Sequence, residues 1–324
     1  MEMGMASPIK AKESGVNPMN KKIISLLFLL ILLVTVTVSY AYFSQSVPDT
    51  DNQTNQDGNV PTNKNTYLGA TISSCPMANN HKPDFSNVYE DTIRAESYAT
   101  LTFDNTYYLA YRDLPRIISQ YVSGKNALDF GCGTGRSTRF IKNLGFTTTG
   151  IDISEEMISI AQRLDPTGTY YRIDDGDFSV LSKSSFDLIL SAFTFDNIPT
   201  MEHKISLLKG LSTLLHSKGT IINLVSSPEI YTHEWASFTT KDFHENTYAK
   251  TGDIVRIITT DFSDKRPCDD IFITEEDYAT VYNSASLQIL TKHKPLATGK
   301  EPYQWVNETH LAPWTIYVLK KKTT

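Results

Sequence analysis

The segment from Asn126 to Arg136 reads Asn-Ala-Leu-Asp-Phe-Gly-Cys-Gly-Thr-Gly-Arg. It begins as a short apolar run, turns on three alternating glycines, and continues into a segment with helical spacing of its apolar residues. Glycine allows the backbone to adopt positive φ and to approach a ligand closely. The first turn of a helix presents unpaired N–H groups. This order of strand, glycine turn and helix predicts a nucleotide-binding corner.

The spacing of the glycines distinguishes between classes of nucleotide-binding turn. A dinucleotide fingerprint, G-x-G-x-x-G, requires its third glycine one residue later, where Arg136 stands, and a P-loop requires a lysine followed by serine or threonine. The pattern here starts at Asp129 and continues through Gly131, Gly133 and Gly135. It resembles motif I of the class I S-adenosylmethionine-dependent methyltransferases. The resemblance implies that Asp129 and these glycines hold the methionine moiety and ribose of that cofactor.

A second acidic residue follows at a suitable distance. The β-branched run 147–151 predicts a second strand, and Asp152 ends it about 20 residues after the first glycine. A carboxylate at this place accepts hydrogen bonds from ribose hydroxyls, and the resemblance implies the same role for Asp152, with Ile153 beside the cofactor. The structural alternative is an aspartate that caps a helix or a turn. Ser154 suits the helix cap better.

The third strand is expected over 169–173, and an acidic loop follows it. The resemblance implies that Asp177 accepts from the adenine amino group and that Phe178 forms an apolar wall beside the ring. Asp174 and Asp175 are rival acidic residues slightly earlier in the loop. A solvated acidic loop without a ligand is the alternative interpretation.

The run 186–193 is apolar and short enough for a buried parallel strand. Sites of open α/β sheets form beyond the carboxyl ends of the strands. We therefore expect Phe193 to contact the cofactor and the loop 194–199 to face the transferred methyl group. A hydroxyl or amine acceptor that starts protonated needs a base, and Asp196 is the first candidate for that role.

An insertion of about fifty residues, 226–274, follows the predicted fifth strand, 220–225. Its alternating stretch 253–262 and the stretch 270–274 predict a hairpin. Long segments at such a position carry function or added structure, so we expect the insertion to select the acceptor. The candidate contacts are Tyr231, His233 and Trp235, with His233 as a second candidate base. Packing of these side chains onto the sheet is the alternative.

The complete order of elements predicts an α/β fold with a doubly wound, mostly parallel, seven-stranded sheet. The sixth and seventh strands are expected at 287–290 and 315–319, and the resemblance implies that the last strand runs antiparallel. Residues 84–122 are rich in aromatic side chains, and Pro115 should divide a helix there. Tyr98 and Tyr107 are candidates for covering the cofactor, with a core position as the alternative.

Composition narrows the classes of ligand. The chain has 324 residues and a net charge of −6, without the basic stripe of a nucleic-acid-binding protein. Its three cysteines do not form a disulfide framework, and no Cys or His pairs occur at zinc-ligand spacing, so no metal site is expected. The aromatic insertion of an acidic chain favours a small-molecule acceptor.

The N-terminal region has a different character. Residues 1–22 are polar and carry lysines, 23–43 form an uncharged and mostly apolar run, and 44–82 are polar. About 20 apolar residues span a bilayer as a helix, and positive charge favours the cytoplasmic side. We therefore expect a cytoplasmic tail, a single membrane anchor, a flexible linker, and a catalytic domain over 83–324. A cleaved signal peptide, which would leave a secreted protein, and a buried helix are the alternatives.

The sequence thus predicts an S-adenosylmethionine-dependent methyltransferase that acts on a small molecule. A protein side chain is the second acceptor class. A nicotinamide-dependent oxidoreductase and a membrane-tethered protein that binds S-adenosylmethionine without turnover are the rival functions.

Overall fold

The computed structural model describes residues 91–322, which lie within one structural unit, Asn79–Thr324. The expected tail 1–22, membrane anchor 23–43, linker 44–82 and domain start at residue 83 fall outside the described residues. Among the residues described, no helix is both long and apolar enough to cross a bilayer.

A seven-stranded sheet forms the centre of the domain, with the strand order β3-β2-β1-β4-β5-β10-β9. The bounds of its strands are β1 Asn126–Phe130, β2 Thr147–Asp152, β3 Thr169–Arg172, β4 Phe186–Ala192, β5 Leu215–Ser226, β9 Leu287–His293 and β10 Trp314–Lys321. The first five pair in parallel, whereas β10 is antiparallel to both of its neighbours. The predicted sheet and its reversed last strand are confirmed. The strand order reverses between β1 and β4, which is where ligands of such sheets bind.

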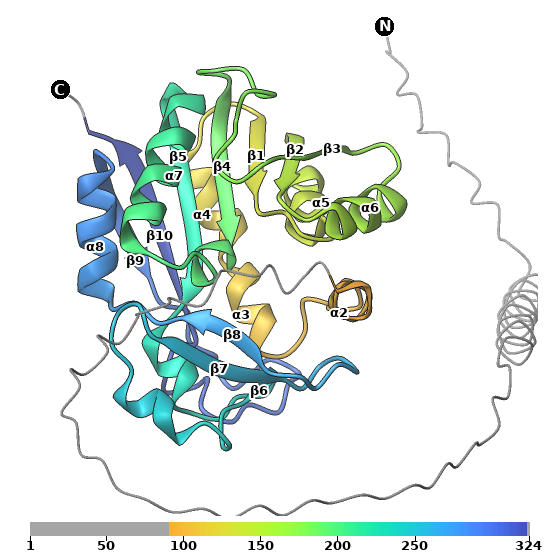
Figure 1. Ribbon diagram of the computed structural model, residues 1–324, viewed down its shortest axis with the longest axis vertical. Helices are drawn as coiled ribbons and strands as arrows, with labels where there is room; N and C mark the ends of the chain where they lie inside the picture. Colours follow the sequence, from red (N-terminus) through yellow and green to blue (C-terminus); the bar gives the residue numbers. More distant parts are fainter. Residues whose placement is uncertain (1–90, 323–324) are drawn as a thin grey trace, which may run out of the picture. The chain divides into compact units, whose positions relative to one another are not determined.

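Helices cover both faces of this sheet (Figure 1). One face packs against α3 (Thr106–Arg112), α4 (Leu114–Tyr121) and α5 (Arg136–Asn143). The other packs against α7 (Met201–Leu214) and α8 (Glu275–Ser284). The helix α6 (Glu155–Leu164) lies against the edge strand β3. Both faces of the central strands are therefore buried, which explains the continuous apolar run of β4.

The helix ends follow the local sequence. Pro115 stands in the first turn of α4, so α3 ends at Arg112 and a new helix starts, as predicted. The Ser154 hydroxyl accepts from the N–H of Met157 and caps α6, and the Thr274 hydroxyl accepts from the N–H of Asp277 and caps α8. These caps fix where α6 and α8 leave the carboxyl edge of the sheet.

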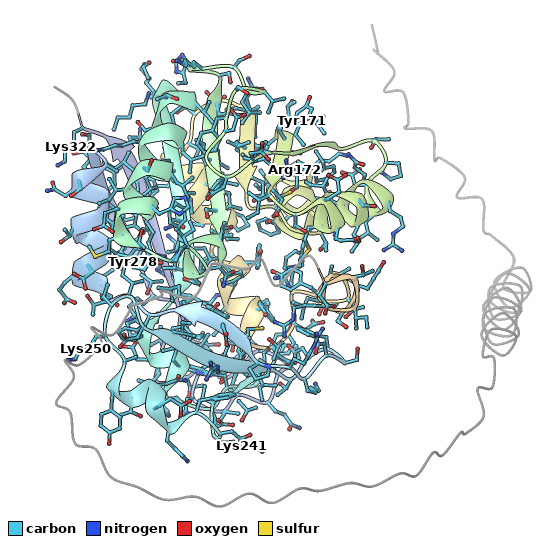
Figure 2. The ribbon with its side chains drawn as sticks, viewed as in Figure 1. Tyr171, Arg172, Lys241, Lys250, Tyr278 and Lys322 are labelled. Atoms are coloured by element: carbon cyan, nitrogen blue, oxygen red, sulfur yellow. The ribbon has the colours of Figure 1, made fainter. Side chains whose placement is uncertain are left out.

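The insertion forms a second, three-stranded antiparallel sheet of β6 (Phe238–Thr239), β7 (Ile254–Thr259) and β8 (Cys268–Ile271). The predicted hairpin is therefore confirmed, and β6 adds a third strand. This sheet lies beyond the end of the large sheet at which α3 and α2 (Thr92–Ala99) also lie (Figure 1). Lys241 and Lys250 project from the insertion on the side away from the large sheet (Figure 2).

Candidate active site

The three glycines of the turn after β1 all have positive φ, but they face different surroundings. A Cβ on Gly131 would lie 2.2 Å from Thr194 Oγ1, and a Cβ on Gly135 would lie 2.8 Å from the Tyr170 hydroxyl. A Cβ on Gly133 would meet nothing closer than the Tyr98 ring at 3.7 Å. Packing therefore requires Gly131 and Gly135, whereas a Cβ on Gly133 would make only ordinary contacts with Tyr98 and with Met157 at 3.9 Å.

Two predicted carboxylates flank this turn. Asp129 is buried, and its Oδ2 accepts from the hydroxyls of Ser137 at 2.7 Å and Thr138 at 2.6 Å, while its buried Oδ1 has no hydrogen-bond partner among residues 91–322. Burial raises the pKa of Asp129 to about 6. Asp152 accepts from the N–H of Gly133 at 2.8 Å and from that of Ser154 at 2.9 Å. Each carboxylate keeps lone pairs for a ligand, because a carboxylate has about four acceptor sites.

The residues predicted around the adenine come together in part. Ile153 and Phe178 are half-buried and pack against the same apolar cluster, and the Phe178 ring lies 6.1 Å from that of Phe130 at the end of β1. Asp177 is exposed and accepts from the N–H of Ser179 at 2.9 Å. The structure therefore supplies an apolar wall from Phe178, while Asp177 lies at the surface.

Arg136, directly after the turn, was not among the predicted site residues. Its guanidinium carbon lies 4.7 Å from the ring centroid of Tyr107 and 5.6 Å from those of Tyr98 and Tyr111. Its Nη1 donates to the carbonyl oxygen of Thr102 at 2.9 Å. Cation–π contacts of this kind gain strength when desolvated, and Arg136 is buried. Arg136 thus connects the glycine turn to α2 and α3.

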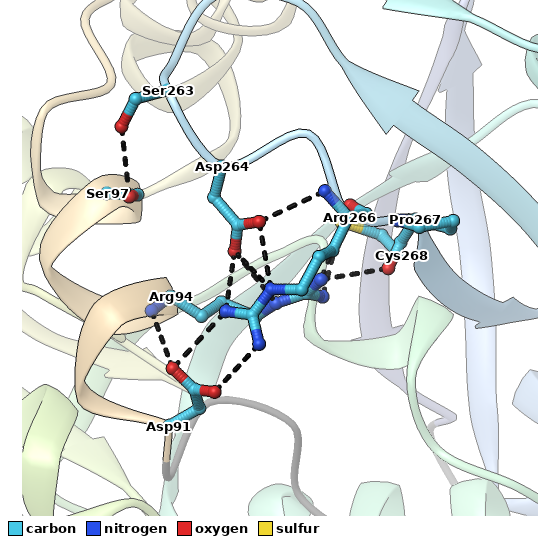
Figure 3. A network of polar contacts seen from close by, with 8 residues as sticks. All are labelled: Asp91, Arg94, Ser97, Ser263, Asp264, Arg266, Pro267 and Cys268. Atoms are coloured by element: carbon cyan, nitrogen blue, oxygen red, sulfur yellow. Dashed lines mark hydrogen bonds and ion pairs between the residues drawn. The ribbon is translucent and has the colours of Figure 1, made fainter. Parts of the chain in front are cut away.

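A polar network, which we call the α2 clasp, fastens α2 to the loop between β7 and β8 (Figure 3). Arg94 donates to the carbonyl oxygen of Pro267 at 2.9 Å and lies 3.5 Å from the carboxylate of Asp264. Arg266 pairs with Asp264 at 2.9 Å and with Asp91 at 2.8 Å. The clasp therefore joins the first described helix to the insertion.

A pocket with an empty volume of about 610 Å³, partly open to solvent, lies between the carboxyl edge of the large sheet and the insertion. Its wall is aromatic on several sides and also contains two carboxylates. The lining residues are Arg94, Tyr98, Tyr107, Phe193, Asp196, Asn197, Ser226, Ile230, Phe238, Ile257, Thr259, Phe262, Cys268, Asp270 and Trp314. Tyr98 lines this pocket and its ring also lies beside Gly133, so the pocket adjoins the glycine turn.

Phe193 follows β4 in a left-handed conformation with φ of 67°. Its N–H donates to the carbonyl oxygen of Leu224 at 2.8 Å, and its ring lies 4.7 Å from that of Trp314. A left-handed backbone is unfavourable for a bulky residue and is concentrated at functional sites. The structure thus places Phe193, predicted as a cofactor contact, in the wall of the pocket.

Asp196 also lines the pocket, as its predicted role as a base requires. Its Oδ2 accepts from the N–H of Ser226 at 3.0 Å, and the Tyr278 hydroxyl from α8 lies 3.5 Å from Oδ1. Tyr278 is labelled in Figure 2. Burial raises the pKa of Asp196, and the nearby ammonium of Lys204 opposes this rise. Burial lowers the pKa of Lys204, whose Nζ donates to the carbonyl oxygens of Phe195 and Ile198.

Asp270 on β8 is a second pocket carboxylate that the sequence analysis did not identify as functional. Its Oδ1 accepts from Asn197 at 2.7 Å and its Oδ2 from the Tyr231 hydroxyl at 3.1 Å. The adjacent pair Asp269-Asp270 in a predicted strand could have indicated this residue. Successive strand residues point to opposite faces of a sheet, so one of the two carboxylates has to face the interior. Asp269 is the exposed member of the pair.

The insertion residues predicted as acceptor contacts lie behind the pocket wall. Trp235 is buried and donates through Nε1 to the carbonyl oxygen of Ile230 at 3.0 Å, and Tyr231 reaches the pocket through its bond to Asp270. His233 is half-buried, with Nδ1 3.1 Å from the carbonyl oxygen of Glu229. None of these three residues lines the pocket. The expected contact of these three residues with the acceptor, and the role of His233 as a base, therefore remain predictions that the pocket lining does not support.

Comparison of the sequence with known proteins identifies related chains. A family described as a methyltransferase domain matches residues 128–221. An uncharacterized methyltransferase of Schizosaccharomyces pombe is 33% identical over 102 residues, which are 30% of this chain and 68% of that protein. An uncharacterized methyltransferase of Bacillus licheniformis is 31% identical over 143 residues, 43% of this chain and 62% of that protein. A demethylmenaquinone methyltransferase of Tropheryma whipplei is 38% identical over 82 residues, 25% of this chain and 34% of that enzyme. The chain thus spans about a third of that enzyme.

Comparison of the structure agrees at the level of the fold. DesVI of Streptomyces venezuelae superposes with a TM-score of 0.50 and 17% sequence identity, over 71% of this chain and 98% of DesVI. The glycine pattern, the strand order with its reversed last strand, and the match to two thirds of the S. pombe methyltransferase point to one family. The chain belongs to the class I S-adenosylmethionine-dependent methyltransferase family.

Proposed function

We propose that the protein transfers the methyl group of S-adenosylmethionine to a small-molecule acceptor. The observation that carries this proposal is the position of the pocket beside the glycine turn, with Tyr98 bordering both. A ligand held at the turn and a second ligand in the pocket would meet beside Tyr98. The position of the pocket therefore supports a reaction between two bound molecules.

The residues around the turn fit S-adenosylmethionine. Gly133 has positive φ and no side chain, so a ligand can approach the backbone of the turn closely. The buried Oδ1 of Asp129 has no donor among residues 91–322, and a ligand amine would supply one. Asp152 would accept from the ribose hydroxyls, with Ile153 and Phe178 as apolar walls of the adenine site. The cofactor supplies an activated methyl group when it is bound.

The protein's own contribution would be to position the acceptor and to exclude water. The aromatic wall supplies an apolar surface, and Asp196 would receive a proton from an acceptor that starts protonated. A carboxylate whose pKa is raised by burial is suited to this task, because proton transfer is most efficient when the pKa lies near the working pH.

The lining of the pocket favours a small acceptor over a protein side chain, since small-molecule sites are lined mostly by apolar and aromatic side chains with a few polar groups. The name of the T. whipplei relative, a demethylmenaquinone methyltransferase, also describes a small-molecule acceptor.

Calorimetry tests the cofactor. We expect the purified protein to bind S-adenosylmethionine and not NAD, and tight binding of NAD alone would contradict the proposal. Incubation with a cell extract and labelled S-adenosylmethionine tests the transfer, and we expect the label in the small-molecule fraction. Label in the protein fraction would support a protein acceptor, and cofactor binding without any transfer would support a non-catalytic protein.

A further inference from the structure

Two carboxylates enter the aromatic pocket from different parts of the chain. Asp196 comes from the segment after β4, and Asp270 comes from β8 of the insertion. They are linked through Asn197, which follows Asp196 in sequence and donates to Asp270 at 2.7 Å. The pocket therefore brings a carboxylate of the large sheet together with a carboxylate of the insertion.

Both carboxylates have unused capacity to accept hydrogen bonds. In Asp270, each oxygen has one donor, from Asn197 and from Tyr231. In Asp196, Oδ2 accepts from the N–H of Ser226, and Oδ1 has the Tyr278 hydroxyl at 3.5 Å. Because a carboxylate has about four acceptor sites, each of the two can take further donors from the pocket side.

The charge of this pair is compensated in part. Lys204 is the cation next to both carboxylates, and its Nζ also donates to two carbonyl oxygens. Arg94, which lines the same pocket, is engaged with Asp264 and with the carbonyl oxygen of Pro267. Buried charges are costly unless they are paired. One positive charge in the pocket would balance the second carboxylate.

We propose that the methyl acceptor is an amine with an apolar body, and that Asp270, together with Asp196, selects it by binding its ammonium group. This inference rests on the proposed function and names the class of its substrate. Asp270 acts as the specificity-determining residue, and Asp196 acts as the base. Two carboxylates with unused acceptor sites lie in one pocket, and aromatic rings form much of the remaining wall.

The rest of the pocket wall suits the same ligand. Tyr107, Phe193, Phe238 and Trp314 line it, and their rings pack with centroid distances of 4.7–6.0 Å. Aromatic faces attract ammonium groups and are used to recognise quaternary ammonium ligands. A neutral alcohol of the same shape would gain the apolar contacts but neither the ion pair nor the cation–π attraction.

Protons, electrons and charge balance in the proposed methyl transfer. The ammonium group gives one proton to the carboxylate of Asp196, which becomes a carboxylic acid, and leaves a neutral amine with a free electron pair. That pair forms the new nitrogen–carbon bond as the carbon–sulfur bond breaks, and the electrons of the broken bond stay on sulfur. The products are a methylated ammonium ion and a neutral thioether. No oxidant, reductant or metal is needed.

Binding experiments with matched ligands test the inference on the full chain in the presence of S-adenosylhomocysteine. The probes are amine and alcohol pairs that share a body, namely 2-phenylethylamine with 2-phenylethanol, cyclohexylmethylamine with cyclohexylmethanol, and hexylamine with hexanol. We expect at least one amine to bind ten times or more as tightly as its alcohol. We expect Asp270→Asn to remove most of this preference without changing the affinity for S-adenosylhomocysteine.

The matched control is Asp269→Asn, on the same strand. The carboxylate of Asp269 is exposed and pairs with Arg256 at 3.0 Å. We expect this variant to keep the amine preference of the wild type. If Asp270→Asn loses the amine preference while Asp269→Asn keeps it, the carboxylate that faces the pocket is the source of the preference. A variant that failed to fold would also lose its affinity for S-adenosylhomocysteine.

The pH dependence gives a second readout. The charged and titratable groups near Asp270 are Asp196, Lys204, Tyr231, Tyr278, Cys268 and Arg94. Burial and the charge of Asp196 raise the pKa of Asp270 above its ordinary value. The free carboxylate therefore loses its proton at higher pH than usual. The affinity for trimethyl(2-phenylethyl)ammonium, which has no ionisable proton, should rise between pH 5 and pH 8 and should rise less in Asp270→Asn.

The outcomes separate the inference from the proposed function. Failure to bind S-adenosylhomocysteine or S-adenosylmethionine would contradict the proposed function itself. Cofactor binding without any amine preferred over its alcohol, or an amine preference that survives in Asp270→Asn, would overturn the inference alone.

Discussion

Asp152 accepts hydrogen bonds from the backbone N–H groups of Gly133 and Ser154, so it joins the glycine turn to the start of α6. It also has acceptor sites left for two ribose hydroxyls. Each hydrogen bond to a charged group contributes about 1.5–3 kcal/mol. We therefore expect Asp152→Ala to weaken S-adenosylmethionine binding at least tenfold in calorimetry.

Asp177→Ala provides the comparison for this prediction, because Asp177 is exposed and contacts Ser179 in its own loop. A similar loss of affinity in Asp177→Ala would support the predicted hydrogen bond between Asp177 and the adenine amino group. Thermal melting of both variants shows whether the fold is intact. An unchanged dissociation constant in a folded Asp152→Ala protein would show that Asp152 stabilises the glycine turn and does not bind the cofactor.

The sequence predicts that Asp129 and Asp152 lie beside the glycine turn, and the structure places both there, because their relation to the glycines is local. It did not identify Asp270, since the direction of that side chain depends on which strand residue faces the pocket. It assigned pocket contacts to Trp235 and His233 because aromatic and basic side chains in a long insertion resemble a binding surface. In the structure, Trp235 is instead part of the buried core beneath the insertion.

At the scale of elements, the α2 clasp joins α2 to the β7–β8 loop (Figure 3), and its Arg94 also lines the pocket. Its central carboxylate, Asp264, has a side chain that is 5% exposed, and that of Arg94 is 8% exposed. Removal of one partner of a buried ion pair leaves the other without compensation. We expect Asp264→Asn to increase hydrogen exchange in α2 and to weaken cofactor binding several-fold, because Tyr98 on α2 lies over Gly133.

The same helix carries a suitable control. Glu96 pairs with Arg163 at 2.6 Å, and both side chains are about half exposed. Exposed ion pairs contribute between about 0 and 1 kcal/mol, so Glu96→Gln should change neither hydrogen exchange nor affinity measurably. Equal effects of Glu96→Gln and Asp264→Asn would show that the charge of α2, and not the clasp, governs its stability.

Most helices and strands could be predicted, because the spacing of their apolar residues and their capping residues depend on the local sequence. The boundaries differ from the prediction where pairing extends a strand. The strand β5 starts at Leu215, five residues before the predicted start, and pairs with β4 through a register irregularity. The short strand β6 has two residues, Phe238 and Thr239, and exists through its pairing with β7.

At the scale of the whole molecule, the residues predicted to hold the cofactor follow strands in the parallel part of the sheet, while the aromatic pocket is lined by residues of the insertion and by Trp314 of β10. Residues 44–82 are predicted to form a polar linker. We therefore expect the apolar run 23–43 to contribute nothing to cofactor binding. We expect deletion of residues 23–43 to move the protein from the membrane fraction to the soluble fraction and to leave its affinity for S-adenosylmethionine unchanged.

Fractionation of cells that express the intact and shortened chains, followed by calorimetry, checks this prediction. A soluble intact chain would contradict the membrane anchor. Aggregation of the shortened chain, with loss of cofactor binding, would instead show that the apolar run belongs to the core.

The contact between α3 and β10 has a consequence for the order in which the protein folds. Trp314 stacks on Tyr107 with a centroid distance of 5.9 Å, and its Nε1 donates to the carbonyl oxygen of Thr106 at 2.8 Å. These partners lie at opposite ends of the described chain, and contacts between residues distant in sequence form slowly. During synthesis from the N-terminus, the glycine turn and its strands emerge long before β10. The nascent chain therefore has the glycine turn and its strands first, and it acquires the complete aromatic pocket after nearly all of the chain has been translated.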